Sequence, residues 1–332
     1  MATLSTYRPT LADHAREMDP NGSVARAVQM LNEINPILDL FPFFEGNLTT
    51  GHRETLETEL PEPVYRLLNQ GVAPTKGQTR QVDFTTALLE DWSEIDKEVA
   101  DLNGNSASYR MSIARRHIQG MSHKFARGLW YGNQTVSPEE FTGLSYYYND
   151  KSGTNGENIL DGGGNGADNA SIWLLVLDRD TIFGIYPKGM QAGLQHDDEG
   201  LQISENAGGA GRLMKVYRDH FVWRHGLVVR DWRYAVRIAN IDVSNLNKEA
   251  SGGSADLVDL MTKALDLPPS LTMGNAGFYM NRTLRTALRQ QMNHQKKDGS
   301  FDQVMGKRVE IFDEVPVYRT DSLLSTEAVV PG

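Results

Sequence analysis

The chain has 332 residues, of which 39% are hydrophobic and 23% charged, so it has room for about two domains and the composition of a soluble folded protein. It contains no cysteine, which excludes disulfides and thiolate metal sites, and no apolar run approaches the roughly 18 residues that a membrane span needs. The net charge of −10 argues against a nucleic-acid reader unless the arginines are segregated on one surface. The first residues do not resemble a secretory signal, and the absence of cysteine suits a reducing cytoplasm.

Residues 1–50 are predicted to form an N-terminal arm. A helical pattern runs from Val24 to Ile34 and is stopped by Pro36, and residues 37–44 are then apolar and aromatic. Aromatic residues on an irregular arm indicate that the arm packs against another surface, either on its own subunit or on a neighbouring molecule.

Residues 51–86 are predicted to form a long two-stranded hairpin. Residues 56–60 and 79–86 alternate as strands do, whereas the prolines and glycines between them forbid a regular strand there. Both strands are polar on both faces, and an isolated hairpin is only marginally stable in water. The hairpin is therefore expected to rest on a partner.

Two helices are predicted next. The spacing of Trp92, Ile95, Val99 and Leu102 predicts a helix that ends near Gly104. Ser106 can cap a second helix that reaches about Trp130 and is roughly 35 Å long. Its predicted buried side carries Tyr109, Ile113, Met121, Phe125 and Leu129.

The rest of the chain predicts an α+β arrangement after a loop at 150–170. Strands are expected near 172–177, 182–186, 213–223, 227–230 and 232–239, and helices near 255–266 and 278–292. The chain is expected to close with a hairpin in which Val309 and Ile311 pair with Val315 and Val317 through the turn Asp313-Glu314.

The run at 223–241 combines two apolar stretches with four arginines. From Trp232 the residues alternate, which predicts one aromatic and aliphatic face and one face with Arg233 and Arg237. The arginine face needs water, carboxylates or phosphates. Because the chain is acidic, carboxylates of this chain or of a neighbour are favoured over DNA.

No catalytic, cofactor-binding or metal site is predicted. The glycine-rich segment 161–169 lacks the Lys-Ser/Thr of a phosphate loop, and HDDEG at 196–200 is expected to be a solvent-facing loop. No nucleophile motif is present. Arg282, Arg285 and Arg289 share one side of a predicted helix, which could meet nucleic acid, an acidic neighbour or only water.

Several segments together resemble one family. In chain order they are EGNLTTGH at 45–52, LNGN at 102–105, LWYGN at 129–133, SPEEFTGLSYYYND at 137–150, NASIWLLVLD at 169–178, GIYPKGMQAGL at 184–194, GLVVRDWRYAVRIANID at 226–242, FYMNRTLRTALRQQ at 278–291 and VPVYRTDSLLSTEAVV at 315–330. They resemble the major capsid proteins of short-tailed double-stranded-DNA bacteriophages of the epsilon-fifteen-like group.

The resemblance implies an α+β fold of the Hong Kong 97 type. It implies an N-terminal arm at 1–50, a hairpin called the E-loop at 51–86, a peripheral domain with a long spine helix at 87–150, a mainly axial domain at 151–300, and a C-terminal hairpin at 301–332 that returns to the peripheral domain.

The implied function is that of a shell subunit without cofactor or enzymatic activity. Copies would assemble in the bacterial cytoplasm into pentamers and hexamers of an icosahedral virion shell around double-stranded DNA, which they touch only weakly and non-specifically. The implied partners are other copies, a separate scaffolding protein, a portal protein and possible cement proteins; no membrane is involved. Candidates for contacts between copies are Arg53, Glu57, Glu59, Arg66, Lys76, Arg80, Arg233 and Arg237.

Two other functions remain open from the residues alone. One is a binding or scaffold protein that forms smaller rings, and the other is an unrecognised hydrolase. Some members of the wider fold join subunits by a Lys–Asn bond, but no motif around Lys76 supports that chemistry.

Overall fold

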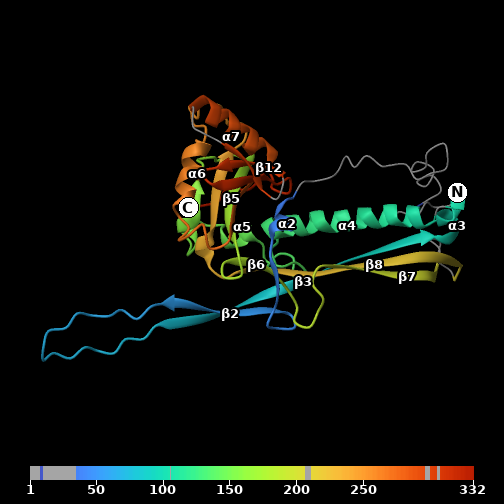
Figure 1. Ribbon diagram of the computed structural model, residues 1–332, viewed down its shortest axis with the longest axis horizontal. Coiled ribbons are helices and arrows are strands. Elements are labelled where there is room, and N and C mark those ends of the chain that lie inside the picture. Colours follow the sequence, from blue (N-terminus) through green and yellow to red (C-terminus); the bar gives the residue numbers. More distant parts are fainter. Residues whose placement is uncertain (1–7, 10–34, 105, 206–210, 296–299, 305–306) are drawn as a thin grey trace.

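The structure is a computed structural model that describes residues 8–9, 35–104, 106–205, 211–295, 300–304 and 307–332. Figure 1 shows a compact region with α6, α7 and β5, an elongated region in which α4 runs along β3, β8 and β7, and a hairpin that projects away from both. The predicted helix at 24–34 lies outside the described residues.

The strands form one large mixed sheet. Their bounds are β1 Phe43–Glu45, β2 Gly51–Glu59, β3 Gln78–Asp96, β4 Ile159–Asp161, β5 Asn169–Leu177, β6 Ile182–Tyr186, β7 Leu194–Glu205, β8 Leu213–Val229, β9 Ala235–Asp242, β10 Asn275–Met280, β11 Ser300–Val304, β12 Lys307–Phe312 and β13 Val315–Arg319. Its main path runs β11-β12-β13-β10-β5-β6-β8-β3-β2, and β1, β4, β7 and β9 pair beside this path.

The helices cover parts of this sheet. They are α2 Ile37–Leu40, α3 Lys97–Ala100, α4 Ser106–Tyr131, α5 Leu144–Tyr147, α6 Leu257–Leu265 and α7 Arg282–Gln295, with short 3₁₀ turns η1 Leu102–Gly104, η2 Gly156–Asn158 and η3 Trp232–Tyr234. No helix in the described part of the chain has the length and apolar character to cross a membrane.

The compact region is held by α6 and α7 packed on β5, β9 and β10. Met261 and Leu284 share one core with Ile172 and Val236. The helix α6 begins where Asp256 accepts hydrogen bonds from the backbone N–H groups of residues 258 and 259, which satisfies two donors that the first turn leaves open.

The long helix α4 confirms its prediction closely. The five side chains predicted to face inward are all buried, and Ser106 is its first residue. Near its end, Phe125, Leu129 and Trp130 pack in the same core as Trp173 of β5 and Tyr279 of β10. This packing joins the elongated region to the compact one.

The helix predicted from Trp92 to Leu102 is wrong. Residues 86–96 of β3 instead lie opposite 216–226 of β8, and only Lys97–Ala100 is α-helical. Ile95 is buried, whereas Trp92 points to the other face and is 45% exposed. Pairing with a neighbouring strand overrides a helical spacing that rested on only four side chains.

The HDDEG segment is a strand and not the loop that we expected, although residues 196–199 are exposed to solvent as predicted. It lies within β7, which pairs with β8 along its length and has a bulge between Asp198 and Gly200. His196 stacks on Phe221 at 4.6 Å between ring centroids. The acidic side chains of an edge strand disfavour pairing with a further strand.

Three boundaries differ from the prediction. Residues 213–229 form one continuous strand, Trp232–Tyr234 is a 3₁₀ turn before β9, and the predicted helix at 278–292 is divided into β10 and α7. The side chains of β9 are buried on both faces from Ala235 to Ile241, so the predicted alternation of an apolar and an exposed face does not hold.

The C-terminal hairpin forms as predicted, with β12 paired to β13. Asp313 and Glu314 have positive φ values of 45° and 72°, which suit the two-residue turn between β12 and β13. The strand β13 pairs with β10, and Val315 and Val317 belong to the core beneath α6 and α7. The apolar face of the hairpin therefore completes the core beneath α6 and α7.

Candidate functional site

The β2–β3 hairpin is the most exposed part of the described chain. The two strands pair from Gly51 opposite Thr85 to Glu59 opposite Gln78. Every residue from 57 to 81 is exposed, and Figure 1 shows this part extending well beyond the rest of the molecule. Its outer part has no core of its own.

The segment 60–77, which we call the hairpin tip, carries large apolar side chains in full contact with solvent. Tyr65 is fully exposed, and Leu68 is 89% exposed. The other exposed apolar residues of the hairpin tip are Leu60, Val64, Leu67 and Val72. Such a concentration of exposed apolar surface indicates a contact that forms only with another molecule.

The charged candidates on the hairpin divide into two groups. Arg53 forms a bidentate pair with Asp83 on the opposite strand, with nitrogen–oxygen distances of 2.6 and 2.7 Å. The hydrogen bonds from Arg53 hold the pKa of Asp83 below its usual value. Arg53 therefore stabilises the hairpin itself, although both side chains remain about half exposed.

The other charged candidates on the hairpin differ in whether they already make a hydrogen bond within the chain. Glu59 accepts a hydrogen bond from the Gln78 side chain at 2.6 Å, and Arg66 donates to the carbonyl of Gln70 at 3.2 Å. Glu57, Lys76 and Arg80 are exposed, and the described part of the chain offers them no hydrogen bond or ion pair.

The two candidates after β8 have local partners. Arg233 forms an ion pair with Asp231 at 2.7 Å and is half exposed. Arg237 is 4% exposed and pairs with Glu327 at 2.7 Å, so its carboxylate comes from the same chain. Burial removes Arg237 from any surface between copies, which corrects its place among the contact candidates.

Arg237 is the centre of a buried polar network that spacing could not reveal. Its guanidinium also donates to the carbonyl of Tyr148 at 2.7 Å and to the hydroxyl of Ser171 at 3.1 Å. Glu327 accepts further hydrogen bonds from the hydroxyls of Tyr131 and Ser171. The sequence offered no signal that position 327, 90 residues later, would supply the carboxylate.

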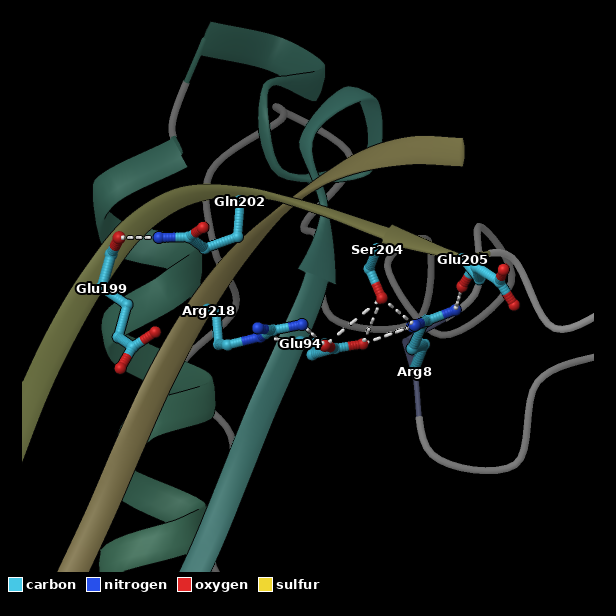
Figure 2. A network of polar contacts seen from close by, with 7 residues as sticks. All are labelled: Arg8, Glu94, Glu199, Gln202, Ser204, Glu205 and Arg218. Carbon is cyan, nitrogen blue, oxygen red and sulfur yellow. Dashed lines mark hydrogen bonds and ion pairs between the residues drawn. The ribbon is translucent and has the colours of Figure 1, made fainter. Parts of the chain in front are cut away.

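A second network ties the first described residues to the far end of the sheet. In Figure 2, Arg8 reaches Glu94 of β3, Ser204 and the carbonyl of Glu205, and Arg218 approaches Glu94 from the other side. Burial alone would raise the pKa of Glu94, but hydrogen bonds from Arg8 and Arg218 outweigh burial and lower it. The pattern of the sequence did not indicate this contact.

Replacing Arg8 by alanine is expected to destabilise the subunit by about 1–3 kcal/mol, because Ser204 and Glu205 lose a buried charged donor. Glu94 retains Arg218, which limits the loss. Urea denaturation of the unassembled subunit measures the change, with Arg66→Ala on the exposed hairpin as the control. Equal stability of the Arg8 and Arg66 variants would contradict this account of the network.

His225 lies in an aromatic enclosure between α4, β8 and the segment after α4. Its ring is 4.4 Å from that of Phe125 and 5.1 Å from that of Phe141, measured between centroids. Burial lowers the pKa of His225 to about 4. The imidazole is therefore neutral in the folded protein at any pH well above 4.

The subunit is expected to lose stability as the pH falls from about 6.5 to about 4. The unfolded chain protonates His225 over this range and the folded chain does not, so unfolding becomes easier by up to about 3 kcal/mol. Urea denaturation at pH 7 and at pH 4.5 measures the difference. His225→Phe should show a smaller difference between the two pH values than the wild type, and an unchanged difference would contradict the assignment.

Among the described residues, no group of three His, Asp or Glu side chains could hold a metal ion. Arg282 of α7 is exposed, while Leu284 and Leu288 on the opposite side are buried. This agrees with the predicted faces of the helix.

Comparison with known proteins identifies the family. The family model of major capsid protein GP7 matches residues 19–331. A chain in the near-atomic-resolution structure of bacteriophage Epsilon15 is 34% identical, with a TM-score of 0.77 and coverage of 99% of both chains. A chain of the bacteriophage JBD30 capsid is 10% identical, with a TM-score of 0.48 and coverage of 88% of this chain and 92% of that one. No match is found among curated protein sequences.

The match to the Epsilon15 chain confirms the resemblance that the motifs carried and the predicted α+β fold of the Hong Kong 97 type. The match at 34% identity extends over the whole chain, including the exposed hairpin. The chain belongs to the family of major capsid protein GP7.

Proposed function

We propose that the chain assembles into pentamers and hexamers of an icosahedral virion shell around double-stranded DNA, and that the hairpin tip fastens each copy to the next. As a member of a major capsid protein family, the chain is a structural subunit of a shell made of its own copies. The observation that carries the proposed role of the hairpin tip is its six exposed apolar side chains.

Apolar burial favours the hairpin tip over the charged candidates as the main source of binding energy. Burying one large aliphatic or aromatic side chain contributes about 1.5–3 kcal/mol. An exposed ion pair contributes only about 0–1 kcal/mol. Glu57, Lys76 and Arg80 then act at the rim of the contact, where charge selects the partner and its orientation.

The position of the hairpin tip supports a head-to-tail contact. It lies at one extremity of an elongated subunit, far from the compact region (Figure 1). A contact between different surfaces of identical copies generates rings when the rotation closes. Pentamers and hexamers are such rings, and they differ by only a small rotation between neighbours.

The remaining partners follow from the same family membership. We propose a separate scaffolding protein during assembly, a portal protein at one vertex and cement proteins on the mature shell, with assembly in the bacterial cytoplasm. A shell subunit of this kind requires no catalytic residue.

Analytical sedimentation and negative-stain microscopy of the purified protein test the proposal. Closed particles in the megadalton range, formed alone or with the scaffolding protein of the same phage, are the expected result. Small closed rings under both conditions would favour a ring-forming binding protein, and monomers with hydrolytic turnover would favour an enzyme. Either result would overturn the proposal.

A further inference from the structure

The charge of α4 differs from that of the rest of the chain. The whole sequence has 33 Lys and Arg against 43 Asp and Glu, yet α4 contains five arginines and lysines and no acidic residue over 26 residues. The arginines of this acidic subunit are therefore segregated in part on one long helix.

Most of these cations are on the surface. Arg110 is the exception, because it turns toward Asp198 and Asp219 at 2.6 and 3.1 Å. The cations at the exposed positions are Arg115, Arg116, Lys124 and Arg127, which we call the α4 basic face. They extend over about 18 Å of helix at 1.5 Å per residue.

Two of the four cations of the α4 basic face have no anionic partner among the described residues and can pair with an external anion. Lys124 pairs with Glu140 at 2.8 Å. Arg115 and Arg127 have no hydrogen bond or ion pair within the part of the chain that the structure describes. An exposed guanidinium without a carboxylate partner can bind an external anion without first breaking an internal ion pair.

The residues between the cations determine which kind of anion fits. From Arg115 to Arg127 the outward positions also carry Gln119, Gly120 and His123, and none of them is apolar. A protein partner such as an acidic helix would need an apolar centre in its interface. A hydrated, strongly charged polymer needs only cations and polar groups.

We propose that the α4 basic face binds the phosphate backbone of duplex DNA. This inference rests on the proposed function, because a shell around DNA supplies both the ligand and many copies of the site. A few phosphate contacts give weak, sequence-independent binding with a dissociation constant of about 10⁻⁴–10⁻⁶ M at physiological salt. Repetition over a shell makes such weak contacts effective while each one remains readily reversible.

Fluorescence anisotropy with labelled duplex DNA tests the proposal on the full-length unassembled subunit at several salt concentrations. The double variant Arg115→Gln, Arg127→Gln removes the two unpaired cations. The matched control Lys188→Gln, Lys248→Gln removes the same net charge from two loops outside α4, where both side chains are exposed. Polyglutamate is a second probe, which represents an acidic protein partner.

The wild type and the control are expected to bind DNA with the same salt dependence. The slope of log K against log salt should be about two units shallower for the α4 variant, since each lost phosphate contact removes about 0.9. Its affinity at 50 mM salt should fall about tenfold or more. Equal DNA binding by the α4 variant and the control, or binding of polyglutamate but not DNA, would overturn the proposal.

Shell formation is scored separately by microscopy on the same preparations. Absence of shells from the wild type, both alone and with the scaffolding protein of the same phage, contradicts the proposed function, whatever the DNA result. Shells with unchanged DNA binding in the α4 variant contradict only this inference.

Discussion

Replacing Glu327 by alanine is expected to lower the free energy of unfolding of the unassembled subunit by about 3–5 kcal/mol. The substitution leaves Arg237 charged and buried, because its side chain is only 5% exposed. The remaining partners of that guanidinium are a carbonyl and a hydroxyl, which cannot neutralise it. Chemical denaturation of the variant beside the wild type measures the loss.

Glu249→Ala is the matched control, because Glu249 is exposed and a surface substitution of this kind changes stability by less than about 0.5 kcal/mol. Arg237→Met combined with Glu327→Leu should recover much of the loss, since an apolar pair of similar volume avoids the unpaired charge. Equal stability of the Glu327 and Glu249 variants would rule out a stabilising role for the buried pair.

The same substitution tests a structural role of residues 320–332, which we call the C-terminal strap. Ser322 accepts a hydrogen bond from the Trp130 indole at 3.0 Å, and the Leu324 N–H donates to the hydroxyl of Tyr131 at 2.9 Å. Further along, Val330 exchanges two hydrogen bonds with the Asn240 side chain. The strap thereby connects the end of α4 with β9, so its loss should loosen the junction between the two regions.

Deleting most of the hairpin tip should leave the stability of the subunit unchanged but strongly reduce assembly. This is the opposite of the loss of stability expected for Glu327→Ala. A deletion of residues 62–76 joins Pro61 to Gly77, whose backbones already lie close together. The deleted residues are all exposed and contribute nothing to a core. The expected result is an unchanged urea midpoint and circular dichroism spectrum, with shell yield reduced at least tenfold in sedimentation.

Point variants separate the apolar and charged contributions of the hairpin. Tyr65→Ser with Leu68→Ser should abolish most shell formation, whereas Lys76→Gln with Arg80→Gln should reduce it only modestly, in line with the energies of apolar burial and exposed ion pairs. The reverse order of the two double variants would assign the contact to the charges. Normal particles from the deletion would remove the hairpin from the assembly mechanism altogether.

The sequence predicted elements well where one periodic pattern dominated. The helix α4 is 26 residues long; Ser106 indicated where it begins, and its apolar stripe indicated its buried side. The hairpin was also predictable, because alternating polar strands enclosed a segment rich in proline and glycine. The turn at Asp313 and Glu314 follows from its position between two short apolar strands.

Prediction from the sequence failed where contacts between residues far apart in the chain decide the structure. Trp92 and Ile95 have helical spacing, but β8 captures this segment as a strand. Arg237 was correctly expected to need a carboxylate, yet its burial depends on Glu327, which only the folded chain brings close. The charged residues of the hairpin were predicted as contacts between copies, whereas the exposed apolar residues of the hairpin tip can supply more binding energy.

A density map of the assembled shell would show directly whether the hairpin tip fastens neighbouring copies. We expect closed particles in which residues 60–72 of each copy are buried against a neighbouring copy, with Tyr65 and Leu68 excluded from solvent. Closed particles in which the hairpin tips project freely into solvent would contradict the proposed fastening role.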